Sequence, residues 1–360
     1  MRFSEFHGEW EKCKLGDIAE FSTARISSVK LDCKNYVSTE NMLQDFQGVV
    51  EAKSVPNETN VISFTCGDIL ISNIRPYLKK VWKATFDGGC SSDVFVLQAT
   101  DTVAKDYLHY AVANDKFINY VMSGAKGVKM PRGDKNQMRT YQLSLPSIQE
   151  QYKIAKLLTL LDERIATQSK LIEKLESLIK GIAQHCIREL INGWEYVRLG
   201  NICKITTGKL DANAQVENGQ YPFFTCAERP FNIDCYAFDT EALLISGNGA
   251  NLGYINYYKG KFNAYQRTYV LDHFSVNIQY VKWALKVLLP QRIAIEKSSS
   301  NTPYIVLSTL ADLKIPIPNN SKQNHIADLM MSFERKLSTQ LVLSDLYNKQ
   351  KQYLLRQMFI

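Results

Sequence analysis

The stretch SIQEQYKIAKLLTLLDERIATQSKLIEKLESLIKGIAQHCIREL, residues 147–190, decides the fold of this chain. Its seam residues recur in alternating steps of four and three, the heptad spacing of a long helix that faces a partner helix. The seam consists of Ile154, Leu158, Leu161, Ile165, Gln168, Ile172, Leu175, Ile179, Ile182 and Cys186. We therefore predict one helix of roughly 65 Å, at ~1.5 Å per residue.

The start of this helix carries its own signals. Pro146 ends the preceding segment, Ser147 can cap the first turn, and Glu150 follows three residues later. This spacing predicts a capping box, in which the serine hydroxyl and the glutamate carboxylate each accept a backbone N–H.

The chain holds its own candidate partner for the seam. A second, less apolar series has the same steps: Ile326, Met330, Phe333, Leu337, Gln340, Ser344, Tyr347, Lys351, Leu354 and Met358. Both polar seam residues, Gln168 and Gln340, are 172 positions apart, as are Ile154 and Ile326. We predict an antiparallel coiled coil with the two glutamines facing each other at its centre. Two unrelated amphipathic helices on separate cores are the alternative.

The globular parts are duplicated as well. WEKCKLGDI at 10–18 and WEYVRLGNI at 194–202 share five of nine residues at an offset of 184. Further matches follow at 68–72 with 242–246, at Pro131 with Pro303, and at 143–146 with 313–316, so the offset falls to 170. An internal repeat of this kind predicts two similar units. The predicted divisions are 1–146, 147–190, 191–316 and 317–360.

Each globule is predicted to be α+β, a twisted sheet with short helices. Short β-branched or aromatic runs predict strands. They lie at 61–64, 69–72, 80–83, 93–97, 242–246, 253–258 and 268–271. Helices are expected at 106–122 and 276–295. The fold class is therefore α+β, with two similar globules joined by two long antiparallel helices about a pseudo-twofold axis.

Composition limits the possible functions. The 360 residues carry a formal net charge of +7 and 45% hydrophobic residues, which suits two folded domains and permits a polyanionic partner. The first residues lack an apolar signal core, and no apolar run is long enough to span a membrane. The eight cysteines are scattered singly, which is typical of reduced thiols in a cytoplasmic protein. Cys226 and Cys235 have too few further ligands nearby to predict a metal site.

Basic residues concentrate at 124–135, a glycine-containing loop. Lysine and arginine there can reach phosphates and base edges, although a solvated surface loop is the alternative. The candidates are Lys126, Lys129, Arg132 and Lys135. The equivalent loop in the second globule offers Lys297, Ser298 and Asn301.

A second candidate cluster combines tyrosines with cations on predicted strands. It contains Lys261, Tyr265 and Arg267, and its counterpart in the first globule contains Arg75, Lys79 and Lys80. These residue types suit phosphate and base contacts, but tyrosines that alternate along a strand are also ordinary sheet residues.

Catalytic motifs are absent from the sequence. An adenine methyltransferase needs an Asn/Asp-Pro-Pro-aromatic tetrapeptide, which this chain lacks. The glycines at 247–253 fit neither the dinucleotide nor the Walker spacing, so we expect a turn between strands. We predict no catalytic, cofactor-binding or metal-binding residues. A DNA-binding subunit, a protein-only coiled-coil scaffold and a self-contained methyltransferase remain as function classes, with the last disfavoured.

Over the whole chain the sequence resembles the specificity subunit of type I restriction-modification enzymes. The resemblance rests on Arg2-Phe3 to Trp10, the repeated Trp-Glu-x-x-basic-Leu-Gly-x-Ile signature, and Leu-x-Leu-Pro-x-x-x-x-Gln at 143–151. The second copy departs at the start of its helix, where a longer run is expected between Pro316 and Gln323.

That resemblance implies a function shared between subunits. Each globule would be a target recognition domain that reads one half of a split sequence in double-stranded DNA. The helix pair would set the spacing and dock two modification (methyltransferase) subunits. S-adenosylmethionine, ATP and magnesium would belong to the modification and restriction subunits, and the specificity subunit itself would be non-catalytic.

Overall fold

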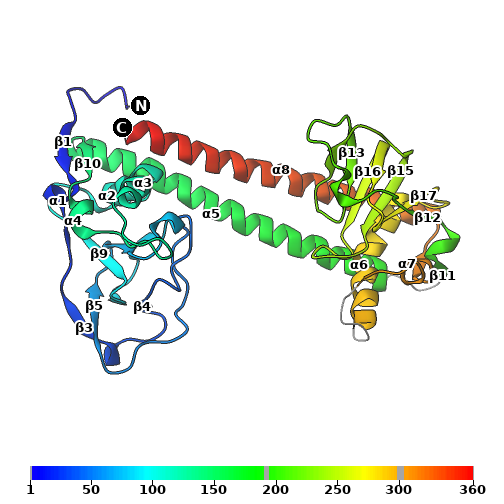
Figure 1. The fold of residues 1–360 in the computed structure, drawn as a ribbon, viewed down its shortest axis with the longest axis horizontal. Coiled ribbons are helices and arrows are strands. Elements are labelled where there is room, and N and C mark those ends of the chain that lie inside the picture. The colour runs from blue at the N-terminus through cyan, green and yellow to red at the C-terminus, as the bar shows by residue number, and fades with distance from the viewer. Residues whose placement is uncertain (1, 190–193, 298–303, 360) are drawn as a thin grey trace. The chain divides into compact units, whose positions relative to one another are not determined.

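The computed structural model describes residues 2–189, 194–297 and 304–359 and divides into two compact units (Figure 1). Unit 1 comprises Met1–Gln168 with Leu343–Ile360, and unit 2 comprises Ser169–Val342. Both divisions fall inside long helices, α5 (Ile148–Gln184) and α8 (Asn320–Met358). Each unit therefore consists of a globule and half of each long helix, because the seam residues of the helices belong to the same cores as the globules.

Unit 1 holds an antiparallel four-stranded sheet, a mixed four-stranded sheet in which β4 and β8 are parallel, and a two-stranded sheet. Their orders are β2-β9-β6-β7, β3-β5-β8-β4 and β1-β10. The strands are β1 (Glu11–Lys14), β2 (Ala19–Phe21), β3 (Arg25–Ser27), β4 (Tyr36–Val37), β5 (Asn60–Phe64), β6 (Ile69–Ser72), β7 (Val81–Lys83), β8 (Gly88–Cys90), β9 (Val94–Ala99) and β10 (Gln142–Leu145). The short helices are α1 (Leu15–Ile18), η1 (Ser28–Lys30), η2 (Pro76–Leu78), α2 (Lys105–Val112), α3 (Asp115–Ser123) and α4 (Lys135–Arg139).

Unit 2 holds one six-stranded sheet, in the order β12-β17-β15-β16-β13-β14, and the pair β11-β18. The strands are β11 (Glu195–Arg198), β12 (Lys204–Thr207), β13 (Tyr221–Phe224), β14 (Phe231–Ile233), β15 (Phe238–Ser246), β16 (Ile255–Ala264), β17 (Thr268–Asp272) and β18 (Lys314–Ile317). The helical segments are the π-helical turn η3 (His185–Glu189), η4 (Leu199–Asn201), η5 (Ala212–Ala214), α6 (Ile278–Lys297) and α7 (Leu307–Ala311). The glycine-rich run between β15 and β16 is a turn, as predicted.

Strand registers show that the units repeat one topology. Ile69 of β6 lies opposite Leu97 of β9, and Leu243 of β15 lies opposite Leu271 of β17, so both partners shift by 174 residues. β5 and β8 keep the same offset, since Phe64 pairs with Gly88 where Phe238 pairs with Phe262. β15 thus corresponds to β5 and β6 joined, and β16 to β7 and β8 joined. The predicted α+β duplication is confirmed.

A tight turn explains why unit 1 has shorter strands. Gly67 has a φ of +91°, a conformation that favours glycine, between β5 and β6. The Asp68 carboxylate accepts the N–H of Thr65 at 2.9 Å, so it closes the turn on itself. Unit 2 has Glu241 and Ala242 at the positions equivalent to Gly67 and Asp68, and β15 continues through them.

The strand that precedes each long helix shows that the predicted offset of 170 between the two copies was wrong at this point. Glu11 lies opposite Leu145 in unit 1, and Glu195 lies opposite Ile317 in unit 2. The offset is therefore 317 − 145 = 172, and Pro318 rather than Pro316 is the counterpart of Pro146. The predicted irregularity in the second copy was wrong: both copies have four residues between proline and glutamine. Residue 317 ends β18, and α8 begins three residues later at Asn320.

A buried glutamine performs the same task in each unit. Gln151 donates its amide to Pro146 O at 2.9 Å and accepts the Ala104 N–H at 2.9 Å. Gln323 donates to Pro318 O at 2.8 Å and accepts the Asn277 N–H at 3.0 Å. Both glutamines are buried, so these bonds satisfy their polar atoms and tie the start of a long helix to a globular helix.

The long helices enter both cores through the predicted seam. In unit 1, Ile154 and Leu158 of α5 share a core with Leu354 and Met358 of α8. In unit 2, Leu175 and Ile179 of α5 share a core with Ile326, Met330, Phe333 and Leu337 of α8. Each unit thus combines one end of α5 with the opposite end of α8, as an antiparallel pair requires. Gln168 is buried in unit 1 and Gln340 is half-buried in unit 2, and their contact stays a prediction.

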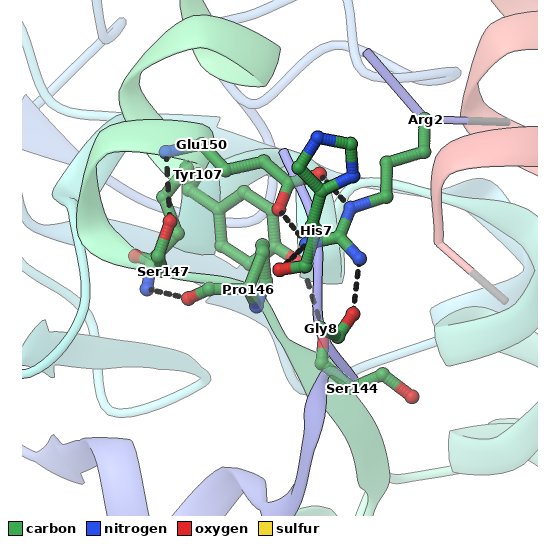
Figure 2. Close-up of polar contacts among 9 residues, drawn as sticks. Arg2, His7, Gly8, Tyr107, Ser144, Pro146, Ser147 and Glu150 are labelled. Atoms are coloured by element: carbon green, nitrogen blue, oxygen red, sulfur yellow. Dashed lines mark hydrogen bonds and ion pairs between the residues drawn. The ribbon is translucent and has the colours of Figure 1, made fainter. Parts of the chain in front are cut away.

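Only half of the predicted capping box takes the expected form. The Ser147 hydroxyl accepts the Glu150 N–H at 3.4 Å, as Figure 2 shows. The Glu150 carboxylate instead binds Arg2, whose Nε and Nη2 donate to its two oxygens at 2.9 and 2.8 Å. The guanidinium also donates to the carbonyls of His7 and Gly8 and lies over the ring of Trp10. The N-terminal segment is thereby fixed to the start of α5.

The helix predicted at 106–122 is two helices. Asn114 separates α2 from α3: its Oδ1 accepts the Phe117 N–H at 3.0 Å, and its amide donates to the carbonyls of Tyr110 and Ala111. Asparagine is common at the N-cap because its side-chain oxygen accepts a backbone N–H of the first helical turn, which has no carbonyl partner within the helix. Hydrophobic periodicity alone does not reveal the break.

His109 on α2 should make unit 1 sensitive to acid. Its Nδ1 is buried without a hydrogen-bond partner, and it faces Lys351, Lys83, Asp162 and Asp106. Burial, with a smaller contribution from Lys351 and Lys83, lowers the pKa of His109 to about 4. The native state therefore binds fewer protons, and stability present above about pH 6.5 is lost as the pH falls towards 4. Urea unfolding at pH 7 and pH 5 should show a smaller loss of stability for His109→Gln. An equal loss in both proteins would contradict this prediction.

Candidate nucleic-acid interface

Three loops of unit 1 meet at one point, which we call the loop junction and define by Asn73, Asp93 and Gly133. The Asn73 N–H donates to Asp93 O at 2.8 Å, and the Gly133 N–H donates to Asn73 O at 3.0 Å. Asn73 follows β6, Asp93 precedes β9, and Gly133 ends the loop between α3 and α4. Segments far apart in the sequence are thus held together by backbone bonds.

Unit 2 has the same junction, formed by Gly247, Arg267 and Ile305. The Gly247 N–H donates to Arg267 O at 2.8 Å, and the Ile305 N–H donates to Gly247 O at 2.9 Å. These residues follow the first junction at offsets of 174, 174 and 172. Backbone geometry is therefore repeated, whereas the side chains at the equivalent positions differ.

The loop at 126–132 projects from the junction of unit 1. Lys126 and Arg132 exchange two backbone hydrogen bonds, at 3.0 and 2.9 Å, which close the loop at its base. Gly127 turns the chain with a φ of +95°. The tip is open to solvent: Val128 is 100% exposed, and Lys129 is also exposed. Exposed lysines on a fixed loop are suited to contacting the phosphates of a nucleic acid.

The β6–β7 turn lies beside this loop and adds a cation. Arg75 has a left-handed backbone with a φ of +50°, and its N–H donates to Pro131 O at 2.8 Å. Its side chain is exposed. The structure thus brings Arg75 together with Lys126, Lys129 and Arg132, all predicted DNA contacts, on one surface of unit 1.

Acids restrain two of these cations. Arg132 pairs with Asp93 at 3.1 Å and Lys126 pairs with Asp134 at 3.6 Å, and all four side chains are at least partly exposed. Backbone N–H groups of Gln137 and Asn136 lower the pKa of Asp134, with a smaller contribution from Lys126. Exposed pairs of this kind are weak and can exchange for a phosphate.

Three predicted contacts in unit 1 are used elsewhere. The Lys135 ammonium lies over the rings of Phe95 and Phe21, at 4.7 and 5.4 Å, and burial lowers its pKa. Lys79 pairs with Asp115 at 2.9 Å. Lys80 donates to Thr39 O at 2.6 Å, and burial also lowers its pKa. The ammonium groups of these three lysines therefore already have partners within unit 1.

Unit 2 divides its predicted contacts between two places. Tyr265 and Arg267 occupy the turn between β16 and β17 at the junction, with Arg267 exposed. Lys261 stands on β16, where its ammonium lies 4.6 Å from the ring centre of Tyr236. Ser298, Asn301 and the side chain of Lys297 lie outside the described residues.

Sequence reasoning missed several junction residues. Asp93, Asn248 and Tyr304 are at or next to the junctions, and Tyr304 is 55% exposed. Asn248 Oδ1 lies 3.0 Å from Cys226 Sγ, which orients the amide. Extending the 174-residue offset beyond β6 and β15 would have paired Asp93 with Arg267. Without the strand register, however, the sequence does not indicate that an aspartate and an arginine occupy equivalent positions, because the two residue types differ.

Two further properties bear on what the site can bind. Within residues 2–189, 194–297 and 304–359, the structure has no group of three His, Cys, Asp or Glu side chains placed to hold a metal ion. Over the same part of the chain, no helix combines the length and apolar character required to cross a bilayer.

Comparison with known proteins gives a match that repeats along the chain. The family model described as "Type I restriction modification DNA specificity domain" matches residues 7–177 and again 191–342. The two matches begin before the two copies of the Trp-Glu signature and together cover most of the chain.

Curated relatives carry related names. The EcoDI type I restriction enzyme specificity subunit of Escherichia coli is 44% identical over 135 residues, which are 38% of this chain and 30% of that protein. The MjaVIII specificity subunit of Methanocaldococcus jannaschii is 26% identical over 241 residues, 58% of this chain and 53% of the relative. The chain thus spans between about a third and a half of the length of these two relatives.

A solved structure shares the fold. The crystal structure of a type I restriction-modification S subunit from M. genitalium superposes with a TM-score of 0.69 at 16% identity. The match covers 100% of this chain and 99% of that one. At this identity the likeness shows that the two chains share a fold.

Proposed function

Because this chain belongs to the type I restriction-modification DNA specificity family, we propose that it is the sequence-reading subunit of such an enzyme. Residues 1–146 and 191–316 would be two target recognition domains, each reading one half of a bipartite target in double-stranded DNA. Segments 147–190 and 317–360 would set the distance between the halves, with Gln168 and Gln340 at the centre of the pair.

The repeated loop junction is the observation that carries this proposal. Each unit builds the same backbone junction from three loops, and each presents different polar side chains there: Asp93 in unit 1 and Arg267 in unit 2. A repeated frame with different side chains is what two readers of two different base sequences need, since base edges differ only in their donor and acceptor pattern. A scaffold that binds only proteins has no such need.

The chain would contribute recognition, and its partners would contribute chemistry. Modification subunits would supply S-adenosylmethionine and methyl transfer, and restriction subunits would supply ATP- and magnesium-dependent steps. The helix pair offers exposed apolar side chains for docking such subunits: Leu160 and Leu346 are about half exposed in unit 1, and Leu178 and Leu341 in unit 2. The scattered single cysteines suit the reducing cytoplasm, where we place the protein.

Selection from random duplex DNA tests this function. The full chain, alone and with co-expressed modification subunits of a type I system, is incubated with a library of random duplexes, and the bound fraction is sequenced. Two short base blocks separated by a gap of constant length are expected. A bound fraction with the same base frequencies as the input under both conditions would contradict DNA recognition and favour the scaffold.

Exchange of one reading unit gives a second prediction. Replacing residues 194–318 by the aligned segment of another family member should change one block of the selected sequence and leave the other block and the gap unchanged. Recognition by separate units has this consequence because each block depends on one globule alone. Methylation mapping of a plasmid modified by the assembled enzyme would measure it. A change in both blocks would contradict the assignment of one block to each unit.

A further inference from the structure

The two loop junctions place different chemistry at one equivalent position. In unit 1 this position holds Asp93, whose carboxylate pairs with Arg132 at 3.1 Å. In unit 2 the same backbone position holds Arg267, and the position of Arg132 holds Tyr304. The charge at this one position is therefore inverted between the units, while the backbone hydrogen bonds are kept.

Arg267 has its guanidinium available for a ligand. Its carbonyl is fixed by the Gly247 N–H at 2.8 Å, and the Tyr265–Thr268 backbone bond of 2.8 Å closes the turn that carries it. Among the residues that the structure describes in unit 2, the side chain of Arg267 forms no ion pair, and it is exposed. A guanidinium on a rigid turn presents two parallel donors, and guanine offers two matching acceptors, O6 and N7.

The junction of unit 1 offers a different pattern. The Asp93 carboxylate has acceptor capacity beyond Arg132, and Arg132 has donors beyond Asp93. Both side chains are partly exposed, at 34% and 53%. An acceptor beside a donor matches the edge of a C·G pair, in which cytosine N4 donates and guanine O6 and N7 accept.

We propose that the loop junction is a specificity-determining position: Arg267 reads a guanine in unit 2, and Asp93 with Arg132 reads a C·G pair in unit 1. This inference rests on the proposed function and adds the residues and the base chemistry. In this arrangement Lys129 at the tip of the loop and Lys126 at its base contact phosphates, and Asp93 with Arg132 at the same base reads the base pair.

Substitution at the junctions tests the proposal with the same random-duplex selection. Arg267→Lys keeps the charge but loses the paired donors. It should reduce the preference for guanine at one base pair of one block roughly 5- to 150-fold, while the dependence of binding on salt is unchanged. Asp93→Ala should relax one C·G position in the other block by a similar factor. The partly exposed Asp93–Arg132 pair contributes little stability, and the side chain of Arg267 is exposed, so both variants should fold.

A charge control and three outcomes decide the result. Lys314→Ala removes one exposed charge from β18 of unit 2, away from the junction, and should leave both blocks unchanged. Relaxation at one base pair in each expected block supports the proposal. Two wild-type blocks that persist unchanged in both junction variants overturn it while the proposed function stands. The absence of any block with the wild-type chain overturns the proposed function itself.

Discussion

Replacing Arg2 by alanine should lower the free energy of unfolding of unit 1 by about 3–5 kcal/mol, because it leaves a buried carboxylate without its cation. Glu150 is completely buried, and both of its oxygens accept from Arg2, 148 residues earlier in the chain. The guanidinium also closes the turn at His7 and Gly8 (Figure 2). The change should therefore release the N-terminal segment as well as weaken the start of α5.

Hydrogen exchange followed by mass spectrometry would measure this effect unit by unit. Peptides from 2–14 and 142–158 should exchange faster in Arg2→Ala, and peptides from unit 2 should not. The double variant Arg2→Ala with Glu150→Leu should recover much of the loss, since no buried charge remains. Lys349→Ala is the matched control in unit 1: its pair with Asp345 on α8 is exposed and should contribute under about 1 kcal/mol. A loss in Arg2→Ala no larger than in this control would contradict the role of the buried pair.

Replacing Arg75, Lys126 and Lys129 together by alanine should weaken DNA binding on the order of a hundredfold, at roughly 1 kcal/mol for each lost contact. The three side chains are exposed on one surface of unit 1, beside the loop junction. Each lost phosphate contact should also reduce the slope of log affinity against log salt concentration by about 0.9. The triple variant should therefore bind more weakly and with a shallower salt dependence.

Equilibrium binding between about 50 and 200 mM salt gives both quantities. A control variant with Lys12, Lys14 and Lys156 replaced by alanine removes the same charge from exposed positions on β1 and α5. If the two variants lose affinity equally, net charge explains the effect and the loop is no contact site. Thermal unfolding of both variants should match the wild type, because all six side chains are exposed.

The sequence predicted most of the fold because the signals for it are local or repeated. Heptad spacing placed both long helices, and short β-branched runs at 61–64 and 69–72 gave β5 and β6. It failed where one polar side chain overrides periodicity, as Asn114 does between α2 and α3. It also failed where two prolines lie close together. Aligning residues 143–146 with 313–316 made Pro316 the counterpart of Pro146, but the strand register shows that the counterpart is Pro318.

The candidate site was predicted less well. The sequence shows where a basic residue stands, but it does not show which groups in the folded protein contact that residue. Lys79, Lys80 and Lys135 resembled Arg75 and Lys126 in composition and spacing. In the structure the first three contact Asp115, Thr39 and two phenylalanine rings, all far away in the chain. Their availability depends on neighbours that only folding provides.

By itself the sequence determined that this protein is a duplicated α+β chain with two long helices whose ends share cores in antiparallel order. The spacing of apolar residues and the identity between the two repeats can be read from the sequence alone. They predict the long helices and the two similar units. Only the tertiary structure decided which cations stay free, and that Asp93 and Arg267 occupy one equivalent position with opposite charge. The physical reason is that ion pairs and burial act between residues close in space, and most of these contacts join residues distant in sequence.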